Sequence, residues 1–249
     1  PPRPGLLEFE NVEFAYDGEV VLKDVSLRFP PGARIGIAGT TGSGKSTIFR
    51  LLFRLADPSA GRVTLSGTDV RELDLDAYRA LFGYAPQEPM LFSDTIRGNI
   101  AFGRDLAEAR LEQAIRAARF ESDLAGIEKG LEEQLGERGT RLSGGQRGRV
   151  AIARALADRP PVLVFDDATS ALDAETEKEL IGHLADDIGK ATVIIVSHRL
   201  SILSACDHIY VLDAGRLVEE GGHAELLARR GLYRKLYERQ LIEEEIEQT

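Results

Sequence analysis

The sequence predicts an α/β fold: a core of strands and helices, preceded by an antiparallel β sub-domain and interrupted by a helical insertion. Residues 6–29 form two stretches in which apolar and polar side chains alternate, and Asp17-Gly18 between them favours a hairpin turn. A short buried strand at residues 34–38 leads into a helix at residues 46–55, which Pro58 is expected to end.

Helical character dominates the insertion, which we expect between about residues 90 and 157. Residues 106–119 and 150–156 have the apolar spacing of helices. The final stretch, residues 224–249, is helical and charged, and we expect it to form a C-terminal extension. The remaining core elements are a strand at 162–165, a helix at 175–184, and strands at 193–197, 208–212 and 216–220.

Composition narrows the class of protein. The chain has 249 residues, of which 43% are hydrophobic, so it can bury a full core. The net charge of −10 argues against a nucleic-acid partner. Cys206 is the single cysteine, which excludes an internal disulfide and fits a reducing compartment.

The apolar runs and the N-terminal residues indicate how this chain relates to a longer protein. No apolar run approaches the ~18 residues that a transmembrane helix requires. Residues 1–5, PPRPG, favour an extended linker. Because Met90 is the single methionine, we expect a chain cut from a longer protein, with residues 1–5 as a linker from a preceding domain and residues 6–249 forming one further domain.

A glycine-rich motif, G-x-x-x-x-G-K-[ST], follows the strand at 34–38 and opens a helix. Its backbone N–H groups can surround phosphate oxygens, and the helix N-terminus favours an anion. Lys45 can reach the β- and γ-phosphates, and Ser46 can ligate Mg²⁺. The candidate phosphate-binding residues are Gly39, Thr40, Thr41, Gly42, Ser43, Gly44, Lys45, Ser46 and Thr47.

Asp166 follows the apolar strand at residues 162–165. A buried strand that delivers a carboxylate at its end matches the Walker B pattern, in which the carboxylate enters the Mg²⁺ shell. Together with the phosphate-binding loop, this strand predicts a site for a nucleoside triphosphate and its magnesium ion.

A second glycine motif, LSGGQ at residues 142–146, makes the prediction more specific. With it the sequence resembles the ABC ATPase family, and the resemblance covers nearly all of the chain. The family's fold has a P-loop NTPase core, and its members bind ATP between two cassettes. The resemblance implies that the signature docks in trans on ATP held by a partner cassette, through Ser143, Gly144, Gly145 and Gln146.

Other positions match family landmarks in order, so their roles are implied by the resemblance alone. Tyr16 matches the aromatic residue that stacks on adenine. Gln87 matches the Q-loop glutamine, which touches Mg²⁺ and relays to the membrane domain. Residues 170–173 match the D-loop, and His198 matches the switch histidine at the γ-phosphate. Lys45, Gln87, Asp167 and His198 are the candidate catalytic residues, and Ser46, Gln87 and Asp166 are the candidate metal ligands.

Two segments resemble exporters within the family. Residues 135–139 are similar to the X-loop, whose Glu137 and Arg138 would contact coupling helices of a transmembrane domain. The segment that follows Gln87, FSDTIRGNIAFG, is similar to exporter cassettes. The resemblance implies a motor domain at the cytoplasmic face of a cell membrane, driving export by ATP hydrolysis.

Asp167 departs from the family pattern, which places glutamate directly after the Walker B aspartate. Its carboxylate is about 1.5 Å shorter in reach, and such a displacement can cost about 10²-fold in rate. We therefore expect poor hydrolysis at this chain's own site and favour a heterodimer with a competent partner. Gly148 also departs, because the family commonly has a long polar residue there.

Three alternatives stay open. The first is a homodimer that tolerates Asp167. The second is a soluble ABC ATPase acting on DNA or ribosomes, which the acidity and the X-loop disfavour. The third is a non-hydrolysing module that dimerises on ATP.

Overall fold

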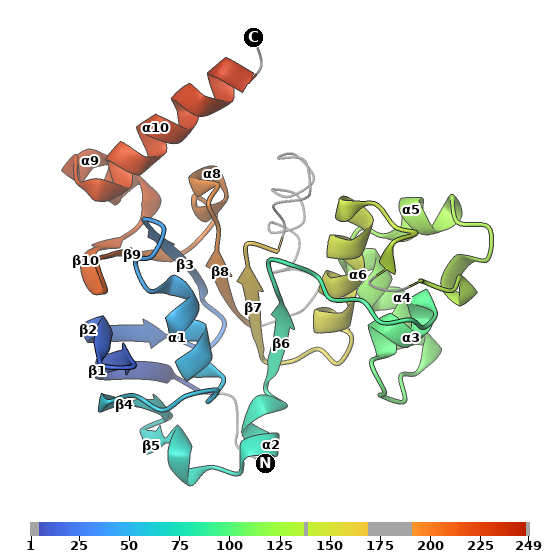
Figure 1. Cartoon of the computed structure of the whole chain (residues 1–249), viewed down its shortest axis with the longest axis horizontal. Helices are drawn as coiled ribbons and strands as arrows, with labels where there is room; N and C mark the ends of the chain where they lie inside the picture. The colour runs from blue at the N-terminus through green and yellow to red at the C-terminus, as the bar shows by residue number, and fades with distance from the viewer. Residues whose placement is uncertain (1–4, 137–138, 169–190, 248–249) are drawn as a thin grey trace. The chain divides into compact units, whose positions relative to one another are not determined.

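The structure, a computed structural model, describes residues 5–136, 139–168 and 191–247. These residues form two compact units (Figure 1): Pro1–Leu81 with Thr192–Thr249, here unit 1, and Phe82–Ala191, here unit 2. Each unit is described by itself. The helix predicted at residues 175–184 lies outside the described residues.

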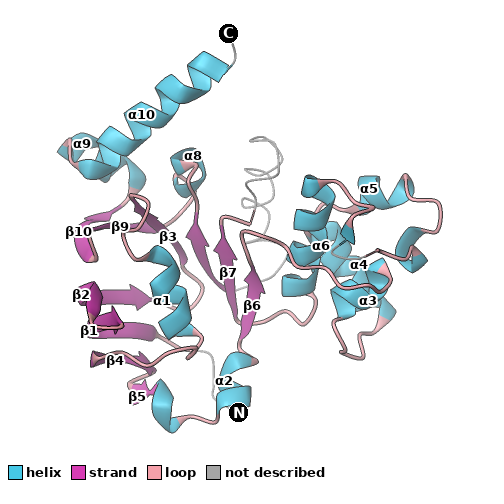
Figure 2. Ribbon diagram, in the orientation of Figure 1, coloured by secondary structure: helices cyan, strands magenta, loops and turns pink. Residues whose placement is uncertain are grey.

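The N-terminal part of unit 1 is an antiparallel sheet with the strand order β2-β1-β4-β5 (Figure 2). Its strands are β1 (Leu7–Tyr16), β2 (Glu19–Phe29), β4 (Ala60–Leu65) and β5 (Thr68–Asp69). Asp17 and Gly18 both have positive φ, 47° and 89°, as the hairpin turn predicted between β1 and β2 requires. The predicted antiparallel β sub-domain is therefore confirmed.

The core of unit 1 is a mainly parallel sheet. Strand β3 (Arg34–Gly39) pairs in parallel with β8 (Thr192–Val196) on one side and β9 (His208–Asp213) on the other. Strand β10 (Arg216–Gly221) is antiparallel to β9. All residues of β8 are buried, as expected of a strand covered on both faces.

Helix α1 (Lys45–Leu52) follows β3 and ends before the predicted position. Arg54 ends it by adopting a left-handed backbone with φ of 50°. The Arg54 guanidinium then donates to the carbonyls of Val70 and Leu73, which fixes the turn well before Pro58.

The other helices of unit 1 are η1 (Val70–Glu72), α2 (Leu75–Arg79), α8 (Leu200–Leu203), α9 (His223–Arg229) and α10 (Leu232–Glu247). The C-terminal stretch is thus two helices, separated at Arg230, which has a φ of 56°. Gly231 follows it and lies against the carboxylate of Glu219, which would have to move to admit a Cβ at this position.

Unit 2 combines two parallel strands with a group of helices. The strands are β6 (Phe82–Ala85) and β7 (Val162–Asp166). The helices are α3 (Ile96–Ala101), α4 (Glu108–Ala117), α5 (Glu121–Ala125), η2 (Gly130–Glu132) and α6 (Gly144–Leu156). The predicted helical insertion is confirmed, and α6 begins earlier than predicted because Ser143 caps it.

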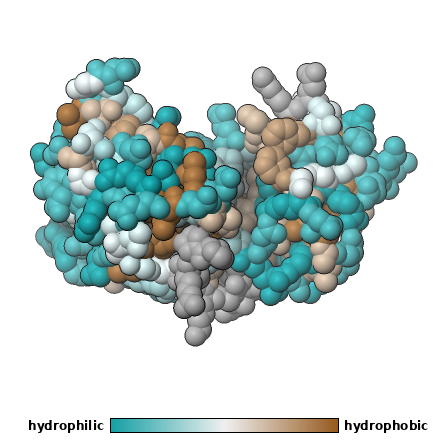
Figure 3. All heavy atoms as spheres, turned by 90° about the horizontal axis from the view of Figure 1, so that it is seen from below, coloured by the Kyte–Doolittle hydropathy of each residue, from teal (hydrophilic) through white to brown (hydrophobic). Residues whose placement is uncertain are grey.

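No helix in the described residues has the length and apolarity needed to cross a membrane. The face drawn in Figure 3 is largely hydrophilic, with separate hydrophobic patches.

Candidate functional site

The loop between β3 and α1 holds the predicted phosphate-binding residues of unit 1. Helix α1 begins at Lys45, so its N-terminus, the positive end of the helix dipole, adjoins the loop. Gly39 has a φ of 149°, and a Cβ there would lie 2.2 Å from the carbonyl oxygen of Leu212. Gly44 has a φ of 102°, and its Cβ would lie 2.6 Å from Leu22. Both glycines are therefore required for the loop to close against the sheet.

Lys45 lies across this loop. Its Nζ donates to the carbonyl of Gly39 over 2.9 Å and to that of Thr40 over 2.8 Å, and the residue is only 8% exposed. Thr40 Oγ1 in turn donates to Asp213 Oδ1 over 2.9 Å, which ties the loop to the end of β9. The ammonium group is thus held at the loop, where it can approach phosphate oxygens.

The hydroxyl group of Ser43 in this loop could be satisfied by a phosphate oxygen of a bound nucleotide. Ser43 Oγ is buried and, among the described residues, no hydrogen-bond partner is found for it. A buried polar atom in this position costs free energy unless a bound oxygen or water satisfies it. The exposed Ser46 hydroxyl lies one residue inside α1 and offers the hard oxygen donor that Mg²⁺ prefers.

Tyr16 ends β1 and is 38% exposed. Its ring packs edge-on against Phe14, with centroids 4.8 Å apart, and the Arg50 guanidinium lies 5.5 Å from its centroid. An exposed, braced aromatic ring beside the phosphate loop's own helix is a suitable platform for a purine base.

His198, the predicted switch histidine, lies beside the phosphate loop in unit 1. Both line a recess of about 260 Å³, to which the loop contributes Gly39, Thr40 and Thr41. His198 is exposed, while Ser197 before it is buried and accepts a hydrogen bond from the N–H of Arg199 over 3.0 Å. The structure therefore brings the histidine together with the loop that the sequence assigned to the same phosphates.

In unit 2, β7 ends on Asp166, as predicted. Tyr84 on β6 donates from its hydroxyl to Asp166 Oδ2 over 3.2 Å. Burial raises the pKa of Tyr84, and the negative charge of Asp166 raises it further, so this hydroxyl stays a donor at neutral pH. The Asp166 carboxylate is thus oriented by a residue that the sequence did not single out.

Asp167 is 6% exposed and has a left-handed backbone with φ of 49°. Gln87 Nε2 donates to its Oδ2 over 3.4 Å. Gln87 is therefore bonded to the residue that directly follows Asp166 in unit 2.

The signature motif forms the start of α6 in unit 2. The Ser143 hydroxyl accepts from the N–H of Gln146 over 3.2 Å, and the Ser143 N–H donates to Gln146 Oε1 over 2.9 Å. This reciprocal capping box fixes the first turn. Ser143 and Gly144 are exposed, so the positive end of the helix dipole is accessible.

Asp123 on α5 supports this motif from outside it. Its carboxylate accepts from Gln146 Nε2 over 3.3 Å and pairs with Arg149 over 2.6 Å, and the Asp123 and Arg149 side chains are each 18% exposed. Sequence reasoning missed Asp123, Tyr84 and Asp213, which carry no local motif. Glu137, Arg138 and the D-loop at 170–173 lie outside the described residues.

A phosphate loop, a Walker B strand end and a capped LSGGQ helix define an ATP-binding cassette. The family model for ABC transporters matches residues 22–170 of this chain. The chain belongs to the ABC transporter family, and it is a nucleotide-binding ATPase domain of that family.

Two curated relatives illustrate the similarity. The chain is 44% identical, over 94% of its length, to an ATM1-type heavy metal exporter of Novosphingobium aromaticivorans, and it spans 39% of that protein. It is 43% identical, over 96% of its length, to a probable multidrug resistance ABC transporter ATP-binding/permease protein of Bacillus subtilis, and it spans 41% of it.

A solved structure is similar as well, that of a bacterial Atm1-family ABC exporter with ATP bound. The TM-score is 0.93 at 42% identity, covering 96% of this chain and 43% of the other. The chain therefore spans about two fifths of the length of these relatives.

Proposed function

We propose that this cassette is the motor domain of an exporter at the cytoplasmic face of a cell membrane, which closes with a second cassette around MgATP to drive transport. The observation that carries the proposal is the exposed, capped signature at Ser143 and Gly144. It supports an anion-binding surface for the phosphates of a nucleotide held by a partner, because a helix N-terminus favours phosphate.

The roles of the residues follow from their chemistry. Lys45 and the loop amides bind the β- and γ-phosphates, and Tyr16 stacks on the base. Bound Mg²⁺, held by Ser46, Asp166 and Gln87, would neutralise charge that develops on the phosphates. Asp167 would orient the attacking water, and His198 would donate to a γ-phosphate oxygen.

Hydrolysis at this chain's own site is proposed to be slow. Asp167 has one methylene fewer than the usual glutamate, and its Oδ2 already accepts from Gln87. The shorter side chain of Asp167 and its hydrogen bond with Gln87 both place the carboxylate farther from the position of the attacking water. We therefore favour a heterodimer in which the partner contributes a competent site, with a homodimer as the alternative.

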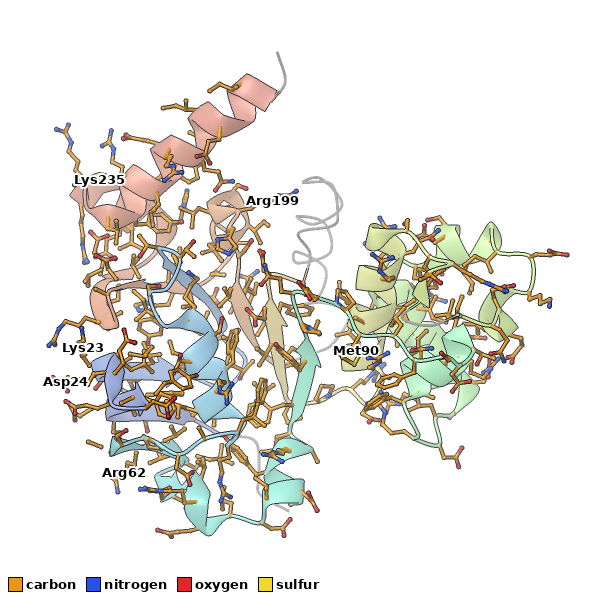
Figure 4. All side chains as sticks on the ribbon, in the orientation of Figure 1. Lys23, Asp24, Arg62, Met90, Arg199 and Lys235 are labelled. Carbon is orange, nitrogen blue, oxygen red and sulfur yellow. The ribbon has the colours of Figure 1, made fainter. Side chains whose placement is uncertain are left out.

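Exposed apolar side chains near Gln87 support a membrane-domain contact. Met90, Phe92 and Phe102 are 66%, 45% and 53% exposed, and Figure 4 labels Met90 in unit 2. The Arg154 guanidinium lies 4.9 Å from the Phe102 centroid and donates to the carbonyl of Met90 over 2.9 Å. Exposed apolar residues that lie together support a partner surface, and we propose that the coupling helices of a transmembrane domain are this partner.

Phosphate release measured with and without a partner cassette tests the proposal. Turnover that requires a second cassette with an intact signature supports it. Turnover by the isolated monomer at the full rate contradicts the trans arrangement. Tight ATP binding without any turnover in either state favours the other candidate, a module that dimerises on ATP without hydrolysing it, which the retracted Asp167 carboxylate also fits.

A further inference from the structure

The C-terminal helix α10 reaches the loop that carries His198. Within unit 1, α10 packs against α8, α9 and β3 (Figure 1). Arg239, Gln240 and Glu243 of α10 line the same recess of about 260 Å³ as His198 and the phosphate loop. The helix is therefore one wall of the recess that the phosphate loop and His198 also line.

One hydrogen bond joins this helix to residues 197–200, here called the switch loop because they include His198. Gln240 Oε1 accepts from the backbone N–H of Leu200 over 2.6 Å, across 40 residues of sequence. Leu200 is the first residue of α8, and the Arg199 side chain at the N-cap position does not cap it. Gln240 therefore supplies the cap that α8 lacks locally.

The switch loop is thereby held at two consecutive amides. Ser197 Oγ accepts from the N–H of Arg199, and Gln240 accepts from the N–H of Leu200. His198 lies directly before these two amides and is itself exposed. The backbone that follows His198 is therefore held by Ser197 from within the loop and by Gln240 from α10.

We propose that Gln240 is a positioning residue for ATP hydrolysis: it sets the backbone of the His198 loop, so that turnover depends on the seating of α10. The proposal rests on the proposed role of His198 at the γ-phosphate. Gln240 is bonded to the backbone N–H of Leu200, two residues after His198, so we assign its effect to the position of the His198 loop. Because the phosphate loop has its own hydrogen bonds, from Lys45 and to Asp213, nucleotide affinity is independent of Gln240.

The test compares Gln240→Leu, which removes the acceptor, with Gln240→Glu, which keeps one. Phosphate release is measured as a function of ATP concentration in a homodimer of this cassette, so that every hydrolytic site contains this chain's own His198, Asp167 and Gln240. Gln240→Leu is expected to lower kcat by about 10- to 100-fold, the effect of a misplaced catalytic group, while KM changes less than about twofold. Gln240→Glu is expected to restore most of the kcat.

Lys235→Ala is the matched control, because Lys235 is an exposed residue of the same helix, labelled in Figure 4. Thermal unfolding of each variant establishes that it is folded. If folded Gln240→Leu keeps the wild-type kcat, or if its KM rises as much as its kcat falls, the positioning role is wrong.

His198→Ala separates this proposal from the function on which it rests. If His198→Ala leaves kcat unchanged, the switch role itself fails. If His198→Ala lowers kcat, Gln240→Leu added to it is expected to cause no further loss, because both act on one group. A fully additive loss in the double variant overturns the claim that Gln240 acts through His198.

Discussion

Gln87 and Asp167 are joined in unit 2: the amide Nε2 of Gln87 donates to the Asp167 carboxylate over 3.4 Å. Asp167 also has a φ of 49°, in the left-handed region that Asp and Asn occupy more readily than other residues. The carboxylate at the position of the family's usual glutamate is therefore held by its own backbone and by a second functional side chain.

Asp167→Glu is expected to raise turnover at this chain's own site by about 10²-fold, because the longer side chain extends the carboxylate toward the water. The same change is expected to lower the free energy of unfolding by about 1 kcal/mol, since glutamate is less favourable than aspartate at positive φ. Single-turnover hydrolysis of γ-labelled ATP and denaturant unfolding measure the two effects.

This test requires a dimer whose opposite cassette carries an intact LSGGQ. Asp167→Asn is the control, because it keeps the backbone preference and removes the charge, and it is expected to lower turnover further. A wild-type site that already hydrolyses ATP as fast as Asp167→Glu would show that the aspartate is a competent base and that the degenerate-site interpretation is wrong.

Lys45→Ala is expected to weaken ATP binding by about 10- to 100-fold, because hydrogen bonds to charged groups contribute about 1.5–3 kcal/mol. Fluorescent-nucleotide titration measures the change, with Lys235→Ala as the exposed-lysine control. Unchanged affinity in Lys45→Ala would refute the assignment of the phosphate loop.

The site could be predicted from sequence where local backbone chemistry determines it. The glycines of the phosphate loop, the Ser143 cap and the aspartate at the end of β7 all follow from residues close to them in the chain. The partners of these groups could not be predicted. Thr40 meets Asp213 across 173 residues, and Tyr84 meets Asp166 across 82. Such pairs depend on strand order and register, and a slip of one residue reverses which side chains face each other.

Gly148→Ala is expected to stabilise the protein by about 1 kcal/mol, because glycine inside a helix is that much less favourable than alanine. A Cβ at Gly148 would meet the carbonyl oxygen of Ala168 at 3.5 Å, an ordinary contact. Gly83→Ala is the opposite control, since its Cβ would lie 2.1 Å from the carbonyl oxygen of Ala155. Thermal unfolding should place the two variants on opposite sides of the wild type, and a destabilised Gly148→Ala would contradict this account of the glycine.

Asp123→Ala is expected to weaken both the fold and the partner's ATP site. Its carboxylate pairs with Arg149, and Arg149 Nε is buried with no hydrogen-bond partner among the described residues. Removing Asp123 leaves a largely buried cation without its counter-charge, which costs about 1–3 kcal/mol of unfolding free energy. Gln146 loses an acceptor in the same change, so the first turn of α6 is held less firmly.

Asp158→Ala provides the comparison for this ion pair. Its pair with Arg104 is more exposed, with side chains 50% and 33% exposed, so its loss is expected to cost less than about 1 kcal/mol. Denaturant unfolding compares the two variants, and phosphate release in a mixed dimer reports the signature's effect in trans. If Asp123→Ala loses no more stability than Asp158→Ala and leaves the partner's turnover intact, Asp123 does not hold the signature. If both fall together, the start of α6 owes its geometry to a carboxylate on α5, outside the LSGGQ motif itself.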